Sequence, residues 1–89
     1  MSFYFYLARC ADSSLYSGSC KNLKDREKAH NEGRGAKYTR SRRPVKIVYF
    51  EKFSTRAEAM RREAQIKKWK RIKKEHLTKY DHPIKTKAE

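Results

Sequence analysis

The stretch that decides the fold is FYFYLARCADSSLYSGSC, residues 3–20. Residues 3–9 and 14–20 are rich in aromatic and small side chains that favour strands. The letters ADSS between them contain the Asp and Ser that favour a tight turn. We therefore predict a β-hairpin at the start of the chain.

The two faces of the first strand carry different side chains. Because successive side chains of a strand point to opposite faces, Phe3, Phe5 and Leu7 share one face, which we expect to be core. Tyr4 and Tyr6 share the other face, and Tyr16 follows in the second strand. Aliphatic residues would serve a core equally well, so these tyrosines call for a further explanation.

A helix, a loop and a third strand are predicted after the hairpin. Asn22 is a favourable N-cap for a helix of about residues 23–31, and Gly33 is suited to end it. A glycine-rich, basic loop then leads to VKIVYFEKF, residues 45–53, which predicts the third strand.

Two more helices follow the third strand. Thr55 and Glu58 form a capping box for a helix that runs through Trp69, and a basic helix covers about residues 70–79. We expect Trp69 and Ile72 to anchor this last helix to the core.

The predicted order of elements is ββαβαα. It indicates an α+β fold in which a small three-stranded antiparallel sheet is flanked by helices. The length of 89 residues suits one domain, which we place at residues 1–80, followed by a flexible C-terminal tail at 81–89.

The charge of the chain indicates its class of partner. It has 24 Lys and Arg residues against 10 Asp and Glu, a formal net charge of +14. Such a surface suits a polyanion, with nucleic acid the first choice and an anionic membrane surface the second. Membrane binding has little support, because no helix combines a broad apolar face with a basic one, and no apolar run is long enough to span a bilayer.

The two cysteines indicate a reducing compartment. Cys10 and Cys20 do not face each other in the predicted hairpin, and with His30 they give a spacing that is not typical of zinc sites. We interpret them as reduced thiols of a cytoplasmic protein.

The first helix places polar residues on the face that should meet the sheet. Leu23, Arg26 and His30 are spaced i, i+3 and i+7, and therefore lie on one face. The alternative is an arginine at the rim of the core and a solvated histidine.

The second helix raises the same question. At 100° per residue, Glu63 falls inside an apolar arc, while Arg62 falls on the opposite, solvent-facing side. The arc consists of Ala57, Ala59, Met60, Ala64 and Ile66. A carboxylate directed at a core is costly unless it is paired or holds a cation. The alternative is an i, i+4 ion pair between Glu63 and Lys67.

Tyrosine, arginine, histidine and one carboxylate together suit the hydrolysis of a phosphodiester. A base must take a proton from water, and arginine's planar fork fits phosphate oxygens. A lone carboxylate suits Mg²⁺, which keeps most of its waters.

These residues resemble the GIY-YIG nuclease superfamily, and within it the small single-domain group related to the N-terminal domain of the excision-repair nuclease subunit. The two signature tripeptides correspond to YFY at residues 4–6 and YSG at residues 16–18. The helix arginine corresponds to Arg26, the residue one turn later to His30, and the acidic residue to Glu63. Tyr4 replaces the glycine of the first tripeptide, and Ser17 replaces the central isoleucine of the second.

The resemblance implies an endonuclease that cuts DNA, structure-selectively or with weak sequence selectivity, in DNA repair. Glu63 would hold Mg²⁺ or Mn²⁺, and Arg26 would stabilise the charge that grows on the phosphate. The base would be Tyr16, Tyr6 or His30, preferred in that order. RNA stays an alternative substrate, and a protein partner that supplies targeting is expected. The alternative function is a nucleic-acid-binding module that is non-catalytic or depends on a partner.

We expect the loop between residues 33 and 44 to bind the substrate. Basic side chains between glycines, with one aromatic ring, suit phosphate contacts and stacking on an unpaired base. The alternative is a solvated basic loop. The candidate residues are Arg34, Lys37, Tyr38, Arg40, Arg42 and Arg43.

Overall fold

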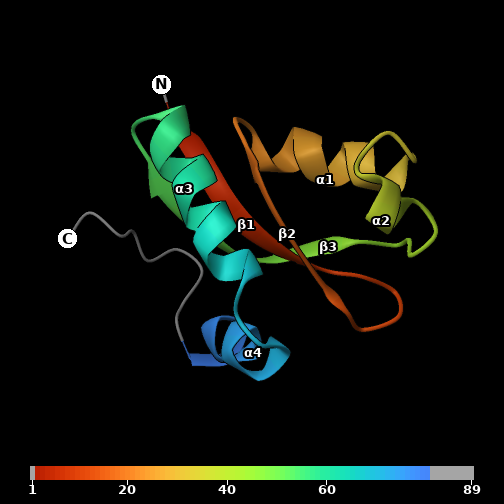
Figure 1. The fold of residues 1–89 in the computed structure, drawn as a ribbon. Coiled ribbons are helices and arrows are strands. Elements are labelled where there is room, and N and C mark those ends of the chain that lie inside the picture. The colour runs from red at the N-terminus through yellow and green to blue at the C-terminus, as the bar shows by residue number, and fades with distance from the viewer. Residues whose placement is uncertain (1, 81–89) are drawn as a thin grey trace.

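The protein is described by a computed structural model that covers residues 2–80 (Figure 1). The tail expected at 81–89 lies outside the described residues. The elements are β1 (Phe3–Arg9), β2 (Leu15–Cys20), α1 (Leu23–Asn31), α2 (Lys37–Arg40), β3 (Lys46–Phe53), α3 (Arg56–Lys67) and α4 (Arg71–Tyr80). The predicted α+β class and order are confirmed. The single-turn helix α2 is an addition to the loop that we expected to be irregular.

The three strands form one antiparallel sheet in the order β2-β1-β3. The predicted hairpin is confirmed, and β1 is the central strand. Within it Tyr6 pairs with Gly18 of β2 on one side and with Phe50 of β3 on the other. Tyr6 therefore lies in the middle of the sheet.

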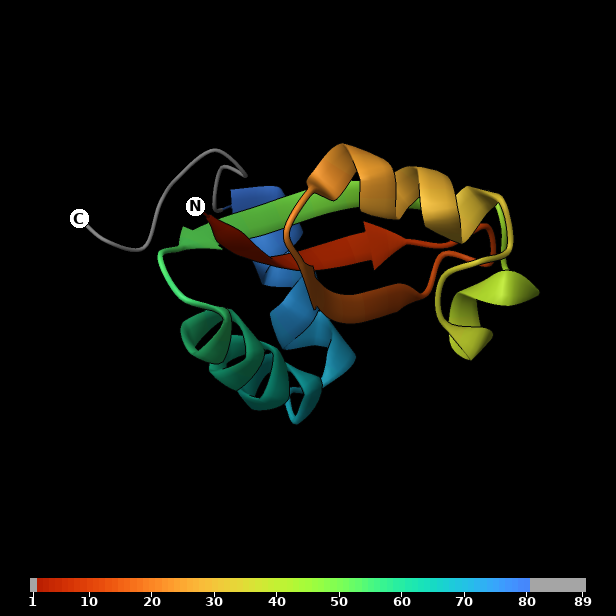
Figure 2. The same cartoon turned by 90° about the horizontal axis from the view of Figure 1, so that it is seen from above.

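Helices cover both faces of the sheet, with α1 on one face and α3 and α4 on the other (Figure 2). Phe5 and Leu7 face α3 and α4, as predicted for a core face. The opposite face is also buried, since Tyr6 and Ala8 pack with Cys10 under α1. The tyrosine face of β1 thus forms a second core, and this core contains the polar hydroxyl of Tyr6.

The predicted caps are confirmed. The Asn22 side chain accepts a hydrogen bond from the Asp25 backbone N–H at 2.9 Å, and Thr55 and Glu58 form the capping box of α3. Gly33 has a φ of 81°, the left-handed conformation that glycine adopts without a steric cost after a helix.

A buried ion pair fixes the rotation of α3 on the sheet. Glu51 of β3 is fully buried and accepts hydrogen bonds from Arg62 at 2.8 and 3.0 Å, and the Tyr49 hydroxyl donates to it at 2.5 Å. The prediction that Arg62 faces solvent is therefore wrong, because β3 supplies an acidic partner beneath the helix. The apolar arc is also narrower than predicted, since Met60 is 52% exposed.

Helix α4 is attached by Leu77, which is buried in the core, and by polar contacts. Arg9 donates to both carboxylate oxygens of Glu75 at 2.6 and 2.7 Å, and Arg71 donates to the Ser13 carbonyl at 2.6 Å. The hydrogen bond from Arg9 lowers the pKa of Glu75 to about 2. Of the two predicted anchors, Trp69 packs against the core, whereas Ile72 is 72% exposed and that prediction is wrong.

The two cysteines do not form a disulfide with each other, as predicted. Cys10 and Cys20 are both free and buried. Among the helices within residues 2–80, none has the length and apolar character needed to cross a membrane.

Candidate active site

A chain of hydrogen bonds runs from the middle of the sheet to α2. The Tyr6 hydroxyl lies 2.7 Å from His30 Nε2, and His30 Nδ1 lies 2.8 Å from Thr39 Oγ1. Thr39 donates its single hydroxyl proton to the Ala36 carbonyl at 2.9 Å. Thr39 Oγ1 must therefore accept a hydrogen bond from the N–H at His30 Nδ1, which leaves Nε2 to accept a hydrogen bond from the Tyr6 hydroxyl.

Burial supports the same protonation states. Tyr6 and His30 are each 1% exposed. Burial, helped by the nearby charge of Arg26, lowers the pKa of His30, so its ring is neutral near pH 7. Burial and the charge of Tyr16 raise the pKa of Tyr6, so its phenol stays protonated. The alternative of a solvated histidine is excluded.

Two glycines let the backbone approach this pair closely. A Cβ atom at Gly18 would lie 2.6 Å from the Tyr6 hydroxyl oxygen, and one at Gly35 would lie 2.8 Å from His30 Cε1. Both distances are shorter than van der Waals contact. The glycine of the second tripeptide is thus required by the ring of the first.

Tyr16 lies beside the buried pair with its hydroxyl available. Its ring centroid is 5.4 Å from His30 and 6.3 Å from Tyr6. The side chain is half-buried, and among residues 2–80 its hydroxyl has no hydrogen-bond partner. Tyr16 is therefore the phenol of this site that is placed to meet a water molecule.

Arg26 and Glu63 reach the site from opposite layers, α1 and α3. The Arg26 side chain is exposed and forms no ion pair within residues 2–80. Glu63, whose side chain is 20% exposed, pairs with Lys67 at 2.9 Å. After burial and the charge of Tyr16, the charges of Arg26 and Glu63 both affect the pKa of Tyr6, Arg26 lowering it and Glu63 raising it. The predicted site residues therefore act on one another electrostatically.

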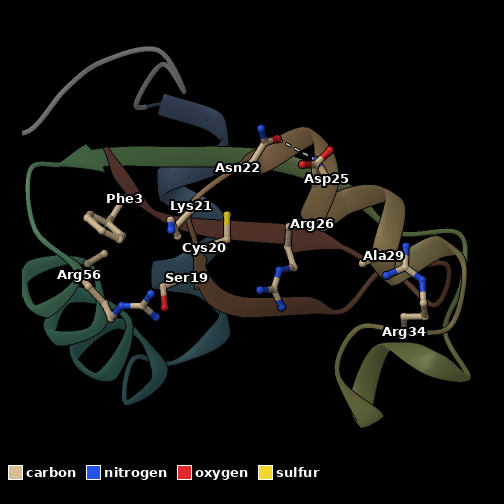
Figure 3. A pocket seen from close by; sticks show the side chains of 11 residues that line it. Phe3, Ser19, Cys20, Lys21, Asn22, Asp25, Arg26, Ala29, Arg34 and Arg56 are labelled. Atoms are coloured by element: carbon tan, nitrogen blue, oxygen red, sulfur yellow. Dashed lines mark hydrogen bonds between the residues drawn. The ribbon is translucent and has the colours of Figure 1, made fainter. Parts of the chain in front are cut away.

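A hollow of about 490 Å³ adjoins Arg26. We call it the β2 groove, because Ser19 and Cys20 of that strand line it between α1 and α3. Figure 3 shows Arg26 at its middle, with Phe3 and Arg56 toward one end and Arg34 toward the other.

Several side chains of the loop predicted to bind the substrate form contacts with other residues of the protein. Arg42 binds Asp12 at 3.0 Å and stacks 3.9 Å above the Tyr38 ring, whose other contact is Tyr16. Stacking of Tyr38 on a base therefore requires Arg42 to move. Arg43 donates to the Arg40 carbonyl at 3.0 Å and to the Asn31 carbonyl at 3.3 Å.

The other cations of the loop differ in their contacts. Arg34 pairs with Glu32 at 2.5 Å and also lines the β2 groove. Lys37 and Arg40 are exposed, and within residues 2–80 their side chains have no charged partner. In this loop Arg42 and Arg43 thus form contacts within the protein, whereas the charges of Lys37 and Arg40 remain available to a ligand.

The fit of a metal ion rests on Glu63. Within residues 2–80, three or more His, Cys, Asp or Glu side chains nowhere gather into a metal-binding group. A lone carboxylate fits Mg²⁺ or Mn²⁺, which keep most of their waters and take further oxygens from a phosphate. A cation bound at Glu63 would replace the ammonium of Lys67.

Two of the residues that support the site carry no signal in the sequence. Thr39 and Gly35 lie in a loop without periodicity, and nothing there indicated contact with a histidine. Glu51 did leave a signal, because it shares a strand face with Tyr49 and is thereby directed into the core.

Comparisons with known proteins agree with the residue pattern. The profile of the GIY-YIG catalytic domain family matches residues 2–80. A UPF0213 protein of Bacillus pumilus is 53% identical over 72 residues, 81% of this chain and 74% of that protein. One of Staphylococcus aureus is 47% identical over 78 residues, 88% and 95% of the two chains.

Two solved structures resemble the fold. The solution NMR structure of UPF0213 protein BH0048 from Bacillus halodurans has a TM-score of 0.58 and 41% identity, covering 91% of this chain and 86% of that one. The solution NMR structure of EF2693 from E. faecalis has a TM-score of 0.59 and 44% identity, covering 89% and 84%.

Proposed function

This chain belongs to the GIY-YIG catalytic domain family, and from that premise we propose that it is a divalent-metal-dependent endonuclease of DNA. The family is a nuclease superfamily. The proposal adds the metal, the substrate and the roles of the residues. A part in DNA repair and a targeting partner stay predictions.

The observation that supports the proposal most is the state of Tyr16 and Arg26. Tyr16 has a hydroxyl and Arg26 a guanidinium without a partner among the described residues, beside a buried pair whose groups are all bonded. Unpartnered polar groups next to a rigid support are what a reacting substrate requires.

Arg26 would bind the scissile phosphate. Its planar guanidinium can donate two hydrogen bonds to phosphate oxygens, and these strengthen as negative charge grows during attack. A metal ion held by Glu63 would supply Lewis-acid stabilisation of the phosphate and of the leaving oxygen.

Tyr16, once its hydroxyl has lost its proton, would as the phenolate take a proton from the attacking water. A cation lies near this phenol, because the pKa of Lys67 is raised by the hydrogen bond and the charge of Glu63 and further by the charge of Tyr16. Tyr6 and His30 hold the Tyr16 ring in position rather than accept that proton, since Tyr6 is buried and already donates to His30.

Replacing Tyr16 and its stacked neighbour Tyr38 tests these roles. Tyr16→Phe keeps the ring but removes the hydroxyl, and we expect cutting of labelled DNA to fall by about 10²-fold or more, with DNA binding retained. The matched variant Tyr38→Phe should cut like the wild type. Equal cutting by Tyr16→Phe and wild type would remove Tyr16 from the reaction.

A further inference from the structure

The side chains that line the β2 groove carry an excess of positive charge. Its lining includes four cations, Lys21, Arg26, Arg34 and Arg56, against a single carboxylate, Asp25. Arg34 is paired with Glu32. Within residues 2–80, however, no carboxylate pairs with Lys21, Arg26 or Arg56, and this excess of positive charge favours an anionic occupant.

The cations lie on both sides of Arg26, which indicates an elongated occupant. Figure 3 shows Lys21 and Arg56 to one side of Arg26, and Arg34 to the other side. The groove follows β2, which is an edge strand of the sheet, so its outer side is open to a long ligand. A chain of phosphates fits this arrangement better than a single phosphate does, because the charges lie in a row.

Phe3 adds an aromatic ring at the end of the row. The Arg56 guanidinium lies 5.5 Å from the centre of that ring, which leaves Arg56 its hydrogen-bond donors. A basic row beside an aromatic ring is the combination that binds a nucleic-acid backbone with little sequence preference.

We propose that the β2 groove binds the sugar–phosphate backbone of the DNA strand that is cut. Lys21 and Arg56 contact phosphates on one side of the scissile phosphate, and Arg34 contacts one on the other side. The inference rests on the proposed nuclease function, in which Arg26 holds the scissile phosphate. It assigns the main grip to this groove rather than to the loop of Lys37 and Arg40.

Charge reversal at matched positions tests the assignment. The groove variant is Lys21→Glu/Arg56→Glu, and the control is Lys24→Glu/Arg61→Glu, which makes the same charge change outside the groove. Arg56 is the first residue of α3, where a glutamate complements the helix dipole, so the variant should fold. A loop variant, Lys37→Glu/Arg40→Glu, represents the competing grip.

Binding is measured in EDTA with a labelled DNA 20-mer, single-stranded and duplex, at several salt concentrations. We expect the groove variant to bind at least ~10-fold more weakly than the control, with a salt dependence reduced by about one unit of slope per lost contact. Binding equal to the control, or a larger loss in the loop variant, would overturn the groove assignment. Cutting by the wild type would still support the nuclease function in that case. Wild-type protein that neither binds nor cuts would overturn both.

Discussion

Tyr6 of the central strand donates a hydrogen bond to His30 of α1 over 2.7 Å, in a position where both side chains are almost fully buried. This bond joins β1 to α1 through two of the candidate site residues. It gives the tyrosine of the opening hairpin a purpose that an aliphatic residue would not serve.

Thr39 should determine which nitrogen of His30 carries the proton. In Thr39→Val the proton on Nδ1 loses its acceptor, so we expect a loss of about 1–3 kcal/mol in the free energy of unfolding. Nitrogen NMR of the His30 ring should also show a changed tautomer population. Thr39→Ser keeps the hydroxyl and should restore both. An unchanged His30 spectrum in the valine variant would exclude this role.

Gly18 should be required by the Tyr6 ring. In Gly18→Ala the new Cβ would lie 2.6 Å from the Tyr6 hydroxyl oxygen, so the ring must shift. We expect urea unfolding to show a loss of about 1–3 kcal/mol. The neighbouring Ser17 has a buried hydroxyl that finds no hydrogen-bond partner among residues 2–80, so Ser17→Ala should be neutral or stabilising. If both variants unfolded alike, the close approach would not matter.

Stability should fall in mild acid because of His30. Its pKa in the folded protein is lowered, mainly by burial, so the unfolded chain binds this proton more readily. The stabilising contribution is complete above the unfolded pKa of about 6.5 and is lost as the pH falls below it toward the folded value. Urea midpoints at about pH 7.5 and 5.5 measure this. The difference should shrink in His30→Gln; an equal difference would assign the effect to other groups.

Arg62 and Arg61 should respond very differently to replacement. Arg62→Ala leaves the buried Glu51 carboxylate without its cationic partner, which should cost about 3–5 kcal/mol. Because Arg62 also sets the rotation of α3, the adjacent Glu63 should shift and cutting should fall. Arg61 is exposed, so Arg61→Ala should stay within about 0.5 kcal/mol of the wild type. Similar denaturation midpoints for the two variants would contradict this account of α3.

The elements with local signals were predicted well from the sequence. The hairpin, both caps and the stop at Gly33 depend on residues close together in the chain. By contrast, Thr39 reaches His30 only through a single-turn helix, which has no repeating pattern. Arg62 was misplaced because helix periodicity alone carries no information about an acidic residue on a strand beneath it.

The candidate residues of the site were predictable from the sequence, but their hydrogen bonds were not. Helix spacing together with the resemblance to the nuclease superfamily identified Tyr6, Tyr16, Arg26, His30 and Glu63 as candidates, and the structure places Tyr6, Tyr16 and His30 in ring contact. What spacing could not give is the direction of each hydrogen bond. That direction separates Tyr6, a buried donor, from Tyr16, whose hydroxyl is available.

The most direct measurement compares wild type and Glu63→Gln on end-labelled single-stranded, duplex, flap and branched DNA with Mg²⁺ or Mn²⁺. We predict that the wild type cuts at least one of these substrates and stops when EDTA is added. Glu63→Gln should bind the same DNA with unchanged or slightly higher affinity and leave it intact. Cutting by Glu63→Gln at the wild-type rate, or no cutting by the wild type on any substrate, would contradict the proposed nuclease site.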